Sequence, residues 1–239
     1  MKSIKFLILI ASVFIMQSSF AQKTPKQFTH ADTLRGSITP ERAWWNVLRY
    51  DIWVKPDYEK KFITGSNTIT FKVIKPGKIM QIDLQEPLKI NSINWNNQQL
   101  KFTREGNAFH VEFPKTLEEG KTESIFINYD GYPKIAVRPP WDGGWIFTKD
   151  KAGRPWMSIA CQGLGASVWY PCKDHQSDEP DNGASLSVTV PDTLIAVANG
   201  RLKERKFNNN GTVTFKWEVV NPINNYDIIP YIGKYVTWH

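Results

Sequence analysis

The sequence predicts an all-β domain, built as a multi-sheet sandwich of antiparallel or mixed strands. Apolar and polar residues alternate with a period of two through most of the chain, which is typical of half-buried strands. Clusters of Gly, Pro and Asn mark turns between these segments, and the 15 Gly and 15 Pro argue against long helices. Of the 239 residues, 41% are hydrophobic and 22% are charged. That balance excludes both a disordered chain and a bundle of membrane spans.

The first 21 residues are predicted to be a secretory signal peptide. Lys2 and Lys5 precede an apolar run over residues 6–16, and Ser-Phe-Ala at residues 19–21 supplies small residues at the cleavage positions. A buried N-terminal helix is the alternative, and the run is too short to span a membrane. We therefore expect a secreted or periplasmic protein that begins at Gln22 and has no membrane segment.

Residues 22–40 are polar and are predicted to form an unpacked lead-in to a single β domain over residues 41–239. About ten to thirteen short strands are expected in that domain, and no repeat period indicates a propeller. The clearest strand faces consist of alternate apolar residues: Leu48, Tyr50, Ile52 and Val54; Ile69, Phe71 and Val73; Met80, Ile82 and Leu84; Phe109, Val111 and Phe113; Ile125, Ile127 and Tyr129; Leu186, Val188 and Val190; Val213, Phe215, Trp217 and Val219.

Residues 131–183 break the alternation because Gly, Pro, Trp and Asp dominate them. Loops carried by a rigid sheet are where binding residues concentrate, and exposed Trp suits a contact surface. The same Trp residues could instead cap the core of the sandwich, since Trp serves burial and interfaces alike. The sequence leaves both interpretations open.

The His residues give no catalytic or metal-binding motif. No H-E-x-x-H pair occurs, which excludes a helical zinc site of that kind. His175 lies among Asp174, Asp178, Glu179 and Asp181, and such a cluster could hold a metal. A solvated acidic loop, in which Asp side chains make local turn bonds, is the commoner explanation. We therefore assign no catalytic residue and no metal ligand to this chain.

Neither the cysteines nor the charge points to a specific partner. Cys161 and Cys172 could form a disulfide in an exported chain or remain two buried thiols. The net charge is +7, and removing Lys2 and Lys5 from the 30 Lys and Arg leaves 28 basic against 23 acidic residues. Because that excess is spread along the chain, we expect no nucleic-acid partner.

One stretch of the loop-rich region resembles a known family. Residues 161–174 read Cys-Gln-Gly-Leu-Gly-Ala-Ser-Val-Trp-Tyr-Pro-Cys-Lys-Asp. This stretch resembles the signature in the N-terminal domain of the aminopeptidase N and leukotriene hydrolase family of gluzincin zinc metallopeptidases, in which Gln or Glu precedes Pro-Cys-x-Asp. Residues 188–191 (Val-Thr-Val-Pro), 197–200 (Val-Ala-Asn-Gly) and 221–223 (Asn-Pro-Ile) resemble later stretches of that domain, in the same order. The resemblance covers about residues 41–239.

The resemblance implies a saddle-shaped β domain that forms one wall of an active-site cleft. In the family, the Gln or Glu before the Pro-Cys stretch binds the free α-amino group of a peptide substrate, and that position falls on Gln162. A Gln carbonyl can accept hydrogen bonds from an ammonium group, although a Gln that bonds the backbone of its own loop is the alternative. The chain departs from the family pattern at Ser167, where Arg is usual, and in a longer loop before Pro180.

In the family, a thermolysin-like catalytic domain with H-E-x-x-H and a further Glu ligand follows the β domain, so we expect one C-terminal to His239. The expected function is the N-terminal substrate-cleft domain of an exported zinc aminopeptidase that removes N-terminal amino acids from peptides. Zinc is implied for the intact enzyme, and this chain alone is expected to bind none and to be inactive. The alternative is a freestanding β-sandwich module that binds a peptide, a glycan or a partner protein.

A face covered by a catalytic domain would leave apolar side chains exposed on the isolated β domain. The expected patch consists of Trp141, Trp145, Trp156, Leu164, Trp169, Tyr235 and Trp238. If most of these side chains were buried inside the β domain, the expectation of a covering domain would rest on the resemblance alone.

Overall fold

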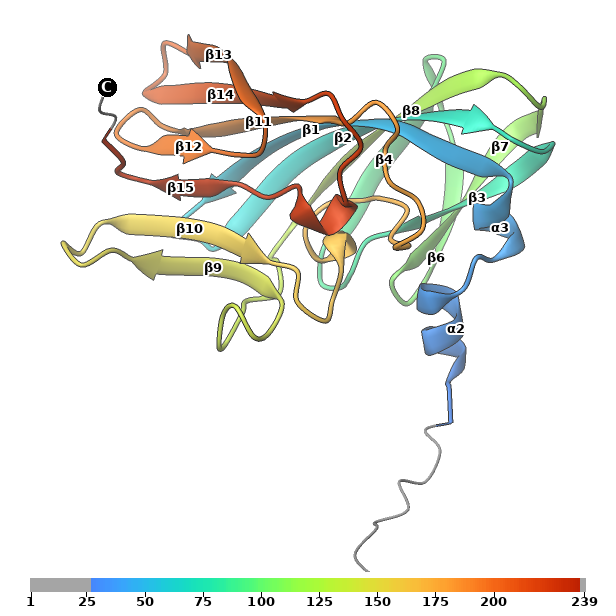
Figure 1. The fold of residues 1–239 in the computed structure, drawn as a ribbon, viewed down its shortest axis with the longest axis horizontal. Helices are drawn as coiled ribbons and strands as arrows, with labels where there is room; N and C mark the ends of the chain where they lie inside the picture. Colours follow the sequence, from blue (N-terminus) through green and yellow to red (C-terminus); the bar gives the residue numbers. More distant parts are fainter. Residues whose placement is uncertain (1–26, 237–239) are drawn as a thin grey trace, which may run out of the picture. The chain divides into compact units, whose positions relative to one another are not determined.

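The computed structural model describes residues 27–236, so the predicted signal peptide and Trp238 lie outside the described residues. The chain divides into two units between Thr33 and Leu34, and the second unit contains the β domain. Its strands form three sheets (Figure 1), which confirms the predicted all-β class and multi-sheet arrangement. The short helical segments are α2 (His30–Gly36), α3 (Pro40–Ala43) and the 3₁₀ turns η1 (Ala166–Val168) and η2 (Asn225–Asp227). Among the described helices, none has both the length and the apolar character needed to cross a membrane.

The largest sheet has eight strands. Its strands β1 and β11 pair in parallel, whereas β1 with β2 and β11 with β14 are antiparallel, so the sheet is mixed, as predicted. In spatial order, its strands are β13 (Arg201–Phe207), β14 (Thr212–Val219), β11 (Ala184–Pro191), β1 (Trp45–Asp57), β2 (Phe62–Val73), β8 (Thr122–Gly131), β4 (Lys89–Trp95) and β5 (Gln98–Gln99).

Two smaller sheets complete the domain. The first has four strands, in the order β12 (Ile195–Val197), β15 (Tyr231–Gly233), β10 (Pro155–Ala160) and β9 (Gly144–Lys149). The second has three strands, in the order β3 (Gly77–Asp83), β7 (Ala108–Leu117) and β6 (Lys101–Glu105). The hairpin β9–β10 lies inside residues 131–183, so the break in the strand pattern predicted there is wrong for this part. Burial does not alternate in β10, because Met157, Ser158, Ile159 and Ala160 are all buried, so a period-two pattern could not reveal this strand.

The buried face of β1 differs from the prediction at one position. The alternation places Leu48 on the same face as Tyr50, but Leu48 is half-buried. A β-bulge between Val47 and Arg49 shifts the register against β2, so that Val47 and Tyr50 are the buried residues on either side of it. A bulge adds one residue to one strand, and the period-two pattern does not show where that happens.

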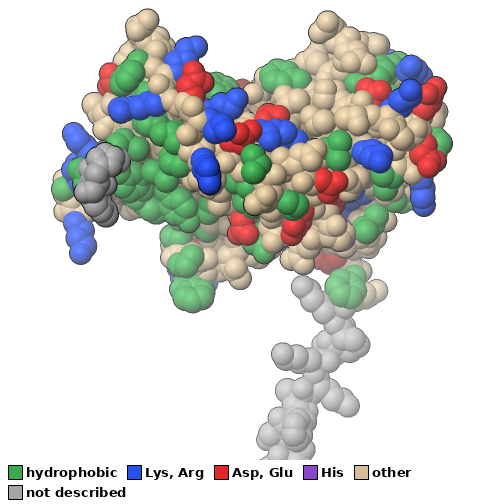
Figure 2. Space-filling view, turned by 45° about the horizontal axis from the view of Figure 1, so that its top comes forward, with side chains coloured by type: hydrophobic (Ala, Val, Ile, Leu, Met, Phe, Trp, Pro, Cys, Tyr) green, Lys and Arg blue, Asp and Glu red, His purple; other side chains and the backbone are tan. Residues whose placement is uncertain are grey.

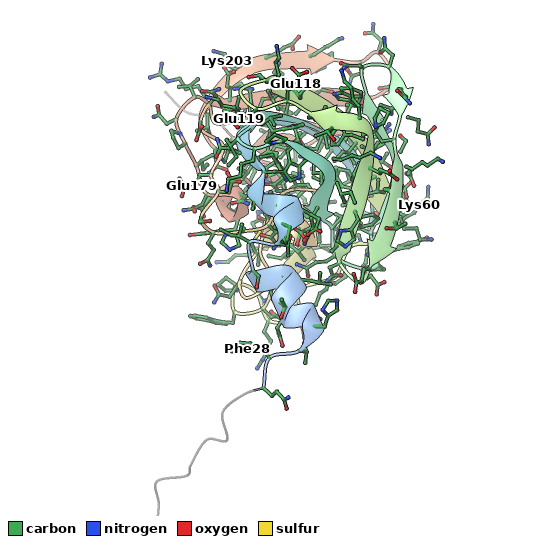
Figure 3. All side chains as sticks on the ribbon, turned by 90° about the vertical axis from the view of Figure 1, so that its right-hand side faces the viewer. Phe28, Lys60, Glu118, Glu119, Glu179 and Lys203 are labelled. Atoms are coloured by element: carbon green, nitrogen blue, oxygen red, sulfur yellow. The ribbon has the colours of Figure 1, made fainter. Side chains whose placement is uncertain are left out.

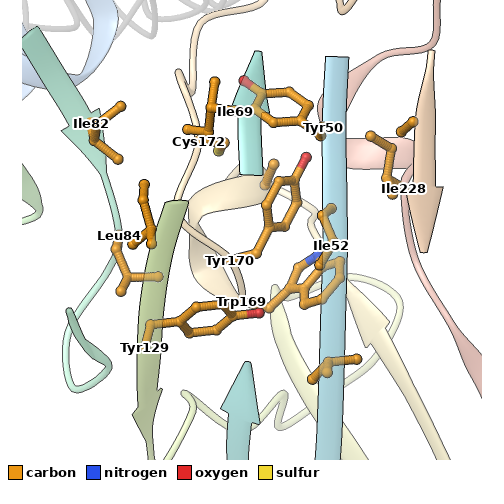
Figure 4. Packing of buried hydrophobic residues seen from close by; sticks show 14 of the residues in the cluster. Tyr50, Ile52, Ile69, Ile82, Leu84, Tyr129, Trp169, Tyr170, Cys172 and Ile228 are labelled. Atoms are coloured by element: carbon orange, nitrogen blue, oxygen red, sulfur yellow. The ribbon is translucent and has the colours of Figure 1, made fainter. Parts of the chain in front are cut away.

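Aromatic side chains from the Pro-Cys region fill part of the core. Trp169 and Tyr170 directly follow η1 and are fully buried. Their ring centroids lie 4.6 Å apart, and the Tyr170 ring packs edge-on against that of Tyr50 at 5.7 Å (Figure 4). Aromatic side chains of this kind bury on the order of 150–250 Å² each. The chain segment over residues 161–172 is therefore anchored in the core at its centre.

The second half of the polar lead-in packs on the β domain, so the prediction that it is unpacked is wrong there. Thr39 donates from Oγ1 to Gln81 Oε1 at 2.9 Å, and Gln81 Nε2 donates to the Leu34 carbonyl at 3.0 Å. Arg42 of α3 is fully buried. A buried guanidinium needs hydrogen-bond acceptors. Two backbone carbonyls within residues 35–37 accept hydrogen bonds from Arg42, so this part of the lead-in is held against the β domain.

Charged side chains project from turns and strand edges. Lys60, Glu118 and Glu119 point outward from turns, and Lys203 points outward from β13 (Figure 3). Opposite charges also pair across strands, as in the contact of Lys203 Nζ with Glu218 Oε2 at 3.2 Å. Such exposed pairs contribute little to stability and are typical of a solvated surface.

Candidate functional site

Gln162 lies on an exposed turn between β10 and η1. The carbonyl of Cys161 closes this turn by accepting hydrogen bonds from the backbone N–H groups of Leu164 at 3.0 Å and Gly165 at 2.9 Å. Gly163 has a φ of +69°, a left-handed conformation that Gly adopts at no steric cost. Within the described residues, the side-chain amide of Gln162 has no hydrogen-bond partner. Both polar groups of that amide therefore remain accessible to a ligand.

Asp174 fixes the end of the turn. Its Oδ1 accepts a hydrogen bond from the Ala166 N–H at 3.2 Å, and its Oδ2 accepts from the N–H and the hydroxyl of Ser167 at 3.2 and 2.5 Å. A Cβ on Gly165 would lie 2.4 Å from Oδ2, so a side chain at this position would displace the carboxylate. Ser167, which departs from the family pattern, therefore serves here as a partner of Asp174.

Asp174 is in turn positioned by the buried ion pair of Asp83 and Arg42. The backbone N–H of Asp174 donates to Asp83 Oδ2 at 3.0 Å, and Arg42 Nη2 donates to the same oxygen at 2.5 Å. Burial raises the pKa of the Asp83 carboxyl, and the positive charge of Arg42 opposes that rise. Asp83 and Cys172 also exchange two backbone hydrogen bonds, of 2.8 and 3.1 Å, which join the Pro-Cys segment to the end of β3.

Two further side chains hold carbonyl groups of the turn. Gln85 Nε2 donates to the Leu164 carbonyl at 2.6 Å and to Ser167 Oγ at 3.0 Å. Arg35 Nη2 donates to the Gly163 carbonyl at 2.7 Å. The backbone on the C-terminal side of Gln162 is thus bound at successive positions, while the Gln162 side chain itself is left free.

The acidic side chains near His175 are directed at separate partners. Asp178 is buried and forms an ion pair with Lys173, which also donates to the Trp45 carbonyl at 2.6 Å. Asp181 accepts a hydrogen bond from Asn46 Nδ2 at 2.8 Å. Among the described residues, no three His, Cys, Asp or Glu side chains converge as a metal site would require. Asp178 is not solvated either, so its role is to neutralise a buried lysine.

Burial lowers the pKa of Lys173, and the nearby carboxylate of Asp178 opposes that change. The Lys173 ammonium also lies over the Trp45 ring, 4.6 Å from its centroid, an arrangement that attracts a cation. The lysine inside the Pro-Cys-Lys-Asp stretch is therefore held in the core and does not reach a ligand at the surface.

Both cysteines are free thiols in the structure. Cys172 is fully buried and Cys161 is half-buried. Burial raises the pKa of the Cys161 thiol to about 12, and the negative charges of Asp174 and Asp227 add to the rise. A thiol with so high a pKa is a poor nucleophile at neutral pH, so these cysteines pack the fold and offer no reactive group.

The sequence predicts a binding role for Gln162 but does not indicate the residues that hold its turn. Arg35, Arg42, Asp83 and Gln85 lie at least 70 positions before it. Arg35 belongs to the predicted lead-in and Asp83 to a predicted strand, whereas Arg42 and Gln85 lie outside both. Long-range contacts of this kind leave no periodic signal in a single sequence. The one local sequence signal for a residue that holds the turn is the Asp of the Pro-Cys-x-Asp stretch, Asp174.

The family model of the Peptidase M1 N-terminal domain matches residues 46–226. The chain belongs to this family. The matched range contains the Gln162 turn, the Asp83–Asp174 contact and most of the three sheets, so the resemblance seen in the sequence is confirmed. M1 peptidases are zinc metallopeptidases, as the names of the solved structures below state. A comparison with curated proteins gives no match.

Solved M1 structures share the fold. An M1 zinc metallopeptidase from Deinococcus radiodurans is 23% identical with a TM-score of 0.66, and the match covers 81% of this chain and 43% of that one. A mutant two-domain M1 zinc metallopeptidase bound to L-arginine is 25% identical with a TM-score of 0.67, covering 80% and 43%. A mutant from D. radiodurans bound to a Tyr-Ser-Ala substrate is 23% identical with a TM-score of 0.67, covering 84% and 45%. This chain therefore spans less than half the length of these solved proteins.

The predicted aromatic patch is present only in part. Trp145 and Trp169 are fully buried inside the β domain, so the prediction is wrong for them; both fill the core, as the capping interpretation allowed. Trp156, Leu164 and Tyr235 are half-buried. Trp141 is exposed over 81% of its surface.

Proposed function

We propose that this chain is the N-terminal substrate-cleft domain of an exported zinc aminopeptidase, and that Gln162 binds the free α-amino group of the peptide. The observation that carries the proposal is the exposed, unpartnered amide of Gln162 on a turn held by Asp174 and Gln85. The family supplies the context, because its Gln or Glu before Pro-Cys-x-Asp takes that role. The predicted leader over residues 1–21 supports export.

The chemistry of the site suits a peptide N-terminus. The Gln162 carbonyl oxygen can accept a hydrogen bond from an ammonium N–H, and a hydrogen bond to a charged group contributes about 1.5–3 kcal/mol. Because the backbone of the turn is already fixed, binding orders little besides the Gln162 side chain. A preorganised group of this kind positions a substrate at low entropic cost.

The described residues do not offer a ligand set for zinc. We therefore assign zinc, and the chemistry it supplies, to a separate catalytic domain, which we place C-terminal to His239. The proposal is supported by the solved M1 relatives, which are more than twice as long as the matched part. This chain contributes the binding of the amine and one wall of the cleft, and no catalytic step is assigned to it.

A second feature supports a covering domain. Trp156 of β10, Tyr231 of β15 and Tyr235, which follows β15, form an aromatic cluster at the four-stranded sheet. Trp156 Nε1 donates to Tyr235 OH at 3.0 Å, and the Trp156 and Tyr231 ring centroids lie 6.4 Å apart. Tyr231 is 45% exposed. Hydrophobic side chains gather around β15 on the face shown in Figure 2, whereas charged side chains are intermixed over the rest of that face. Partly exposed aromatic clusters are typical of interfaces.

Substitution of Gln162 tests the proposal on the purified chain. Binding of the tripeptide Tyr-Ser-Ala is followed by chemical-shift changes in NMR, which detect weak binding. Gln162→Ala is expected to weaken binding by about tenfold or more because one charged hydrogen bond is lost. Gln162→Glu should bind at least as tightly as the wild type, since a carboxylate makes a charge-assisted bond to the ammonium.

Gln176→Ala is the matched control, because Gln176 is also an exposed Gln in a loop of the same segment. It should bind the tripeptide like the wild type. Equal weakening by Gln162→Ala and Gln176→Ala, or no weakening by either, would contradict the assigned role. Peptide binding that is unchanged by substitution of Gln162 but weakened by substitution of other loop residues would favour the freestanding binding module.

A further inference from the structure

A strongly exposed Trp stands on the loop that leads into β9. Trp141 is 81% exposed, and Val137 of the same loop is 82% exposed. The other described Trp residues are buried or half-buried, which makes Trp141 unusual in this domain. Single exposed apolar side chains are common on protein surfaces, but Trp is the residue type most enriched at the energetic centres of binding sites.

The loop that carries Trp141 is ordered by its own hydrogen bonds. The Asp142 carboxylate accepts from the N–H groups of Val137 at 2.8 Å and Arg138 at 2.6 Å, and the Trp141 N–H donates to the Arg138 carbonyl at 2.9 Å. Burial acts to raise the pKa of Asp142, but the backbone N–H groups outweigh it and lower the pKa. Asp142 is therefore ionised at neutral pH and holds the loop in one shape.

This loop packs directly against the turn that carries Gln162. A Cβ on Gly143 would lie 2.8 Å from the Gln162 carbonyl oxygen and 2.7 Å from the Leu164 side chain, so the two backbones touch. Two residues of extended chain span at most about 7 Å. The backbone of Trp141 is thus within about 7 Å of a residue in contact with the Gln162 turn.

We propose that Trp141 forms a side-chain subsite beside Gln162, and that it favours peptides whose N-terminal residue is aromatic. The proposal rests on the amine-binding role of Gln162 and adds a preference that this role does not require. A peptide held by its ammonium group at Gln162 places the side chain of its first residue nearest to that turn. An indole that is exposed over 81% of its surface can stack with an aromatic ring, and its loop is already ordered.

The expected gain is modest and measurable. An aromatic pair contributes about 0.5–1.5 kcal/mol beyond its burial, which corresponds to about 2- to 10-fold in affinity. The test compares Phe-Ser-Ala with Ala-Ser-Ala on the purified chain by NMR titration, each with a free and with an acetylated N-terminus. The indole N–H signal of Trp141 is assigned by its loss in Trp141→Ala and should shift on addition of Phe-Ser-Ala.

Three variants test whether the preference for an aromatic first residue depends on Trp141. Trp141→Ala should reduce the ratio of the two affinities to about one, while Trp141→Phe should keep part of the preference. Phe207→Ala is the matched control, because Phe207 is also an exposed aromatic residue, 57% exposed on β13, and it should leave the ratio unchanged. Because Trp141 is exposed over 81% of its surface, its replacement by Ala should leave the fold intact, and a circular dichroism spectrum verifies this.

The outcomes separate this proposal from the one on which it rests. If acetylation weakens binding but Trp141→Ala leaves the Phe-to-Ala ratio unchanged, the subsite is wrong and the role of Gln162 stands. If acetylation has no effect on either peptide, the amine-binding role is wrong and the subsite is overturned with it. A ratio that falls in Trp141→Ala, with acetylation sensitivity retained, supports both.

Discussion

The carboxylate of Asp174 occupies the space that a side chain on Gly165 would need, since a Cβ on Gly165 would lie 2.4 Å from Asp174 Oδ2. Asp174 cannot move away easily, because it accepts three hydrogen bonds from residues 166 and 167. Its own backbone N–H is bound by Asp83. The exposed turn that carries Gln162 is therefore continuous with a buried polar network, and its shape depends on that network.

Gly165→Ala should destabilise the domain strongly. Gly165 has a φ of +82°, and Gly153 has a φ of +77° but no atom within 4 Å of its Cβ position. Gly153→Ala should therefore cost about 1–2 kcal/mol in backbone strain alone. Gly165→Ala adds a steric clash, which should cost about 1–3 kcal/mol more. Urea denaturation measures both free energies of unfolding, and equal values for the two variants would contradict the account of the Asp174 contact.

The buried ion pair should be far more sensitive to the loss of one partner than a surface pair. Asp83→Leu leaves the Arg42 guanidinium buried without its counter-ion, which should cost about 3–5 kcal/mol. Replacing both, as in Arg42→Met with Asp83→Leu, should recover much of that loss because no charge then remains buried. Lys78→Gln breaks the exposed pair with Glu112 and serves as the control, with little effect expected on urea denaturation. A double variant as unstable as Asp83→Leu alone would contradict this reasoning.

Much of the fold could be predicted from the sequence, because half-buried strands carry a period of two. Ile125, Ile127 and Tyr129 are all buried on one face of β8, as the alternation indicates. The prediction for Leu48 was wrong because a β-bulge shifts the period-two pattern of buried residues, and no local sequence signal marks the bulge. The hairpin β9–β10 was hidden by composition, since Gly144 and Pro155 stand at the starts of its strands.

The site could be predicted less completely. Gln162 was identified through the resemblance of the stretch around it, and its exposure agrees with a binding role, which stays a prediction. Arg42 could not be identified because its burial depends on Asp83, which lies 41 residues further along the chain. The sequence also does not show that Trp141 is exposed and Trp145 is buried, because both lie in one Gly-rich stretch. Trp141 precedes β9, whereas Trp145 lies in it.

The cysteines should behave as two unreactive thiols. We expect two free thiols per chain after denaturation and very slow labelling of the native protein at pH 8, because burial raises the pKa of Cys161 to about 12. A disulfide reagent followed by absorbance measures both, and a chain without free thiols after denaturation would contradict this.

The raised pKa of Cys161 makes the free energy of unfolding depend on pH. The folded pKa of Cys161 is about 12 against a reference of 9.0, so the native state binds the proton more tightly than the unfolded state. Its contribution is fully present below about pH 9 and is lost as the pH rises toward 12. Cys161→Ala should therefore lose less stability than the wild type between pH 8 and 10 in urea denaturation. An identical pH dependence of the two proteins would show that the thiol is not shielded as described.

The purified chain should not hydrolyse aminoacyl chromogenic substrates, with or without added zinc. The described residues provide no zinc ligand set, and the sequence has no H-E-x-x-H to supply ligands and a general base. Inactivation by a chelator is the control that identifies a contaminating metallopeptidase. Zinc-dependent turnover that follows the chain through every purification step would contradict the assignment of catalysis to a separate domain.

The central claim is that Gln162 binds the α-amino group of a peptide, and the most direct test changes that group in the ligand. The affinity of the purified chain for Tyr-Ser-Ala is compared with its affinity for N-acetyl-Tyr-Ser-Ala by NMR titration at pH 7. Acetylation removes the charge and two of the donors, so the free peptide should bind about tenfold more tightly or better, as expected for one hydrogen bond to a charged group. Equal affinities for the two peptides would contradict the claim.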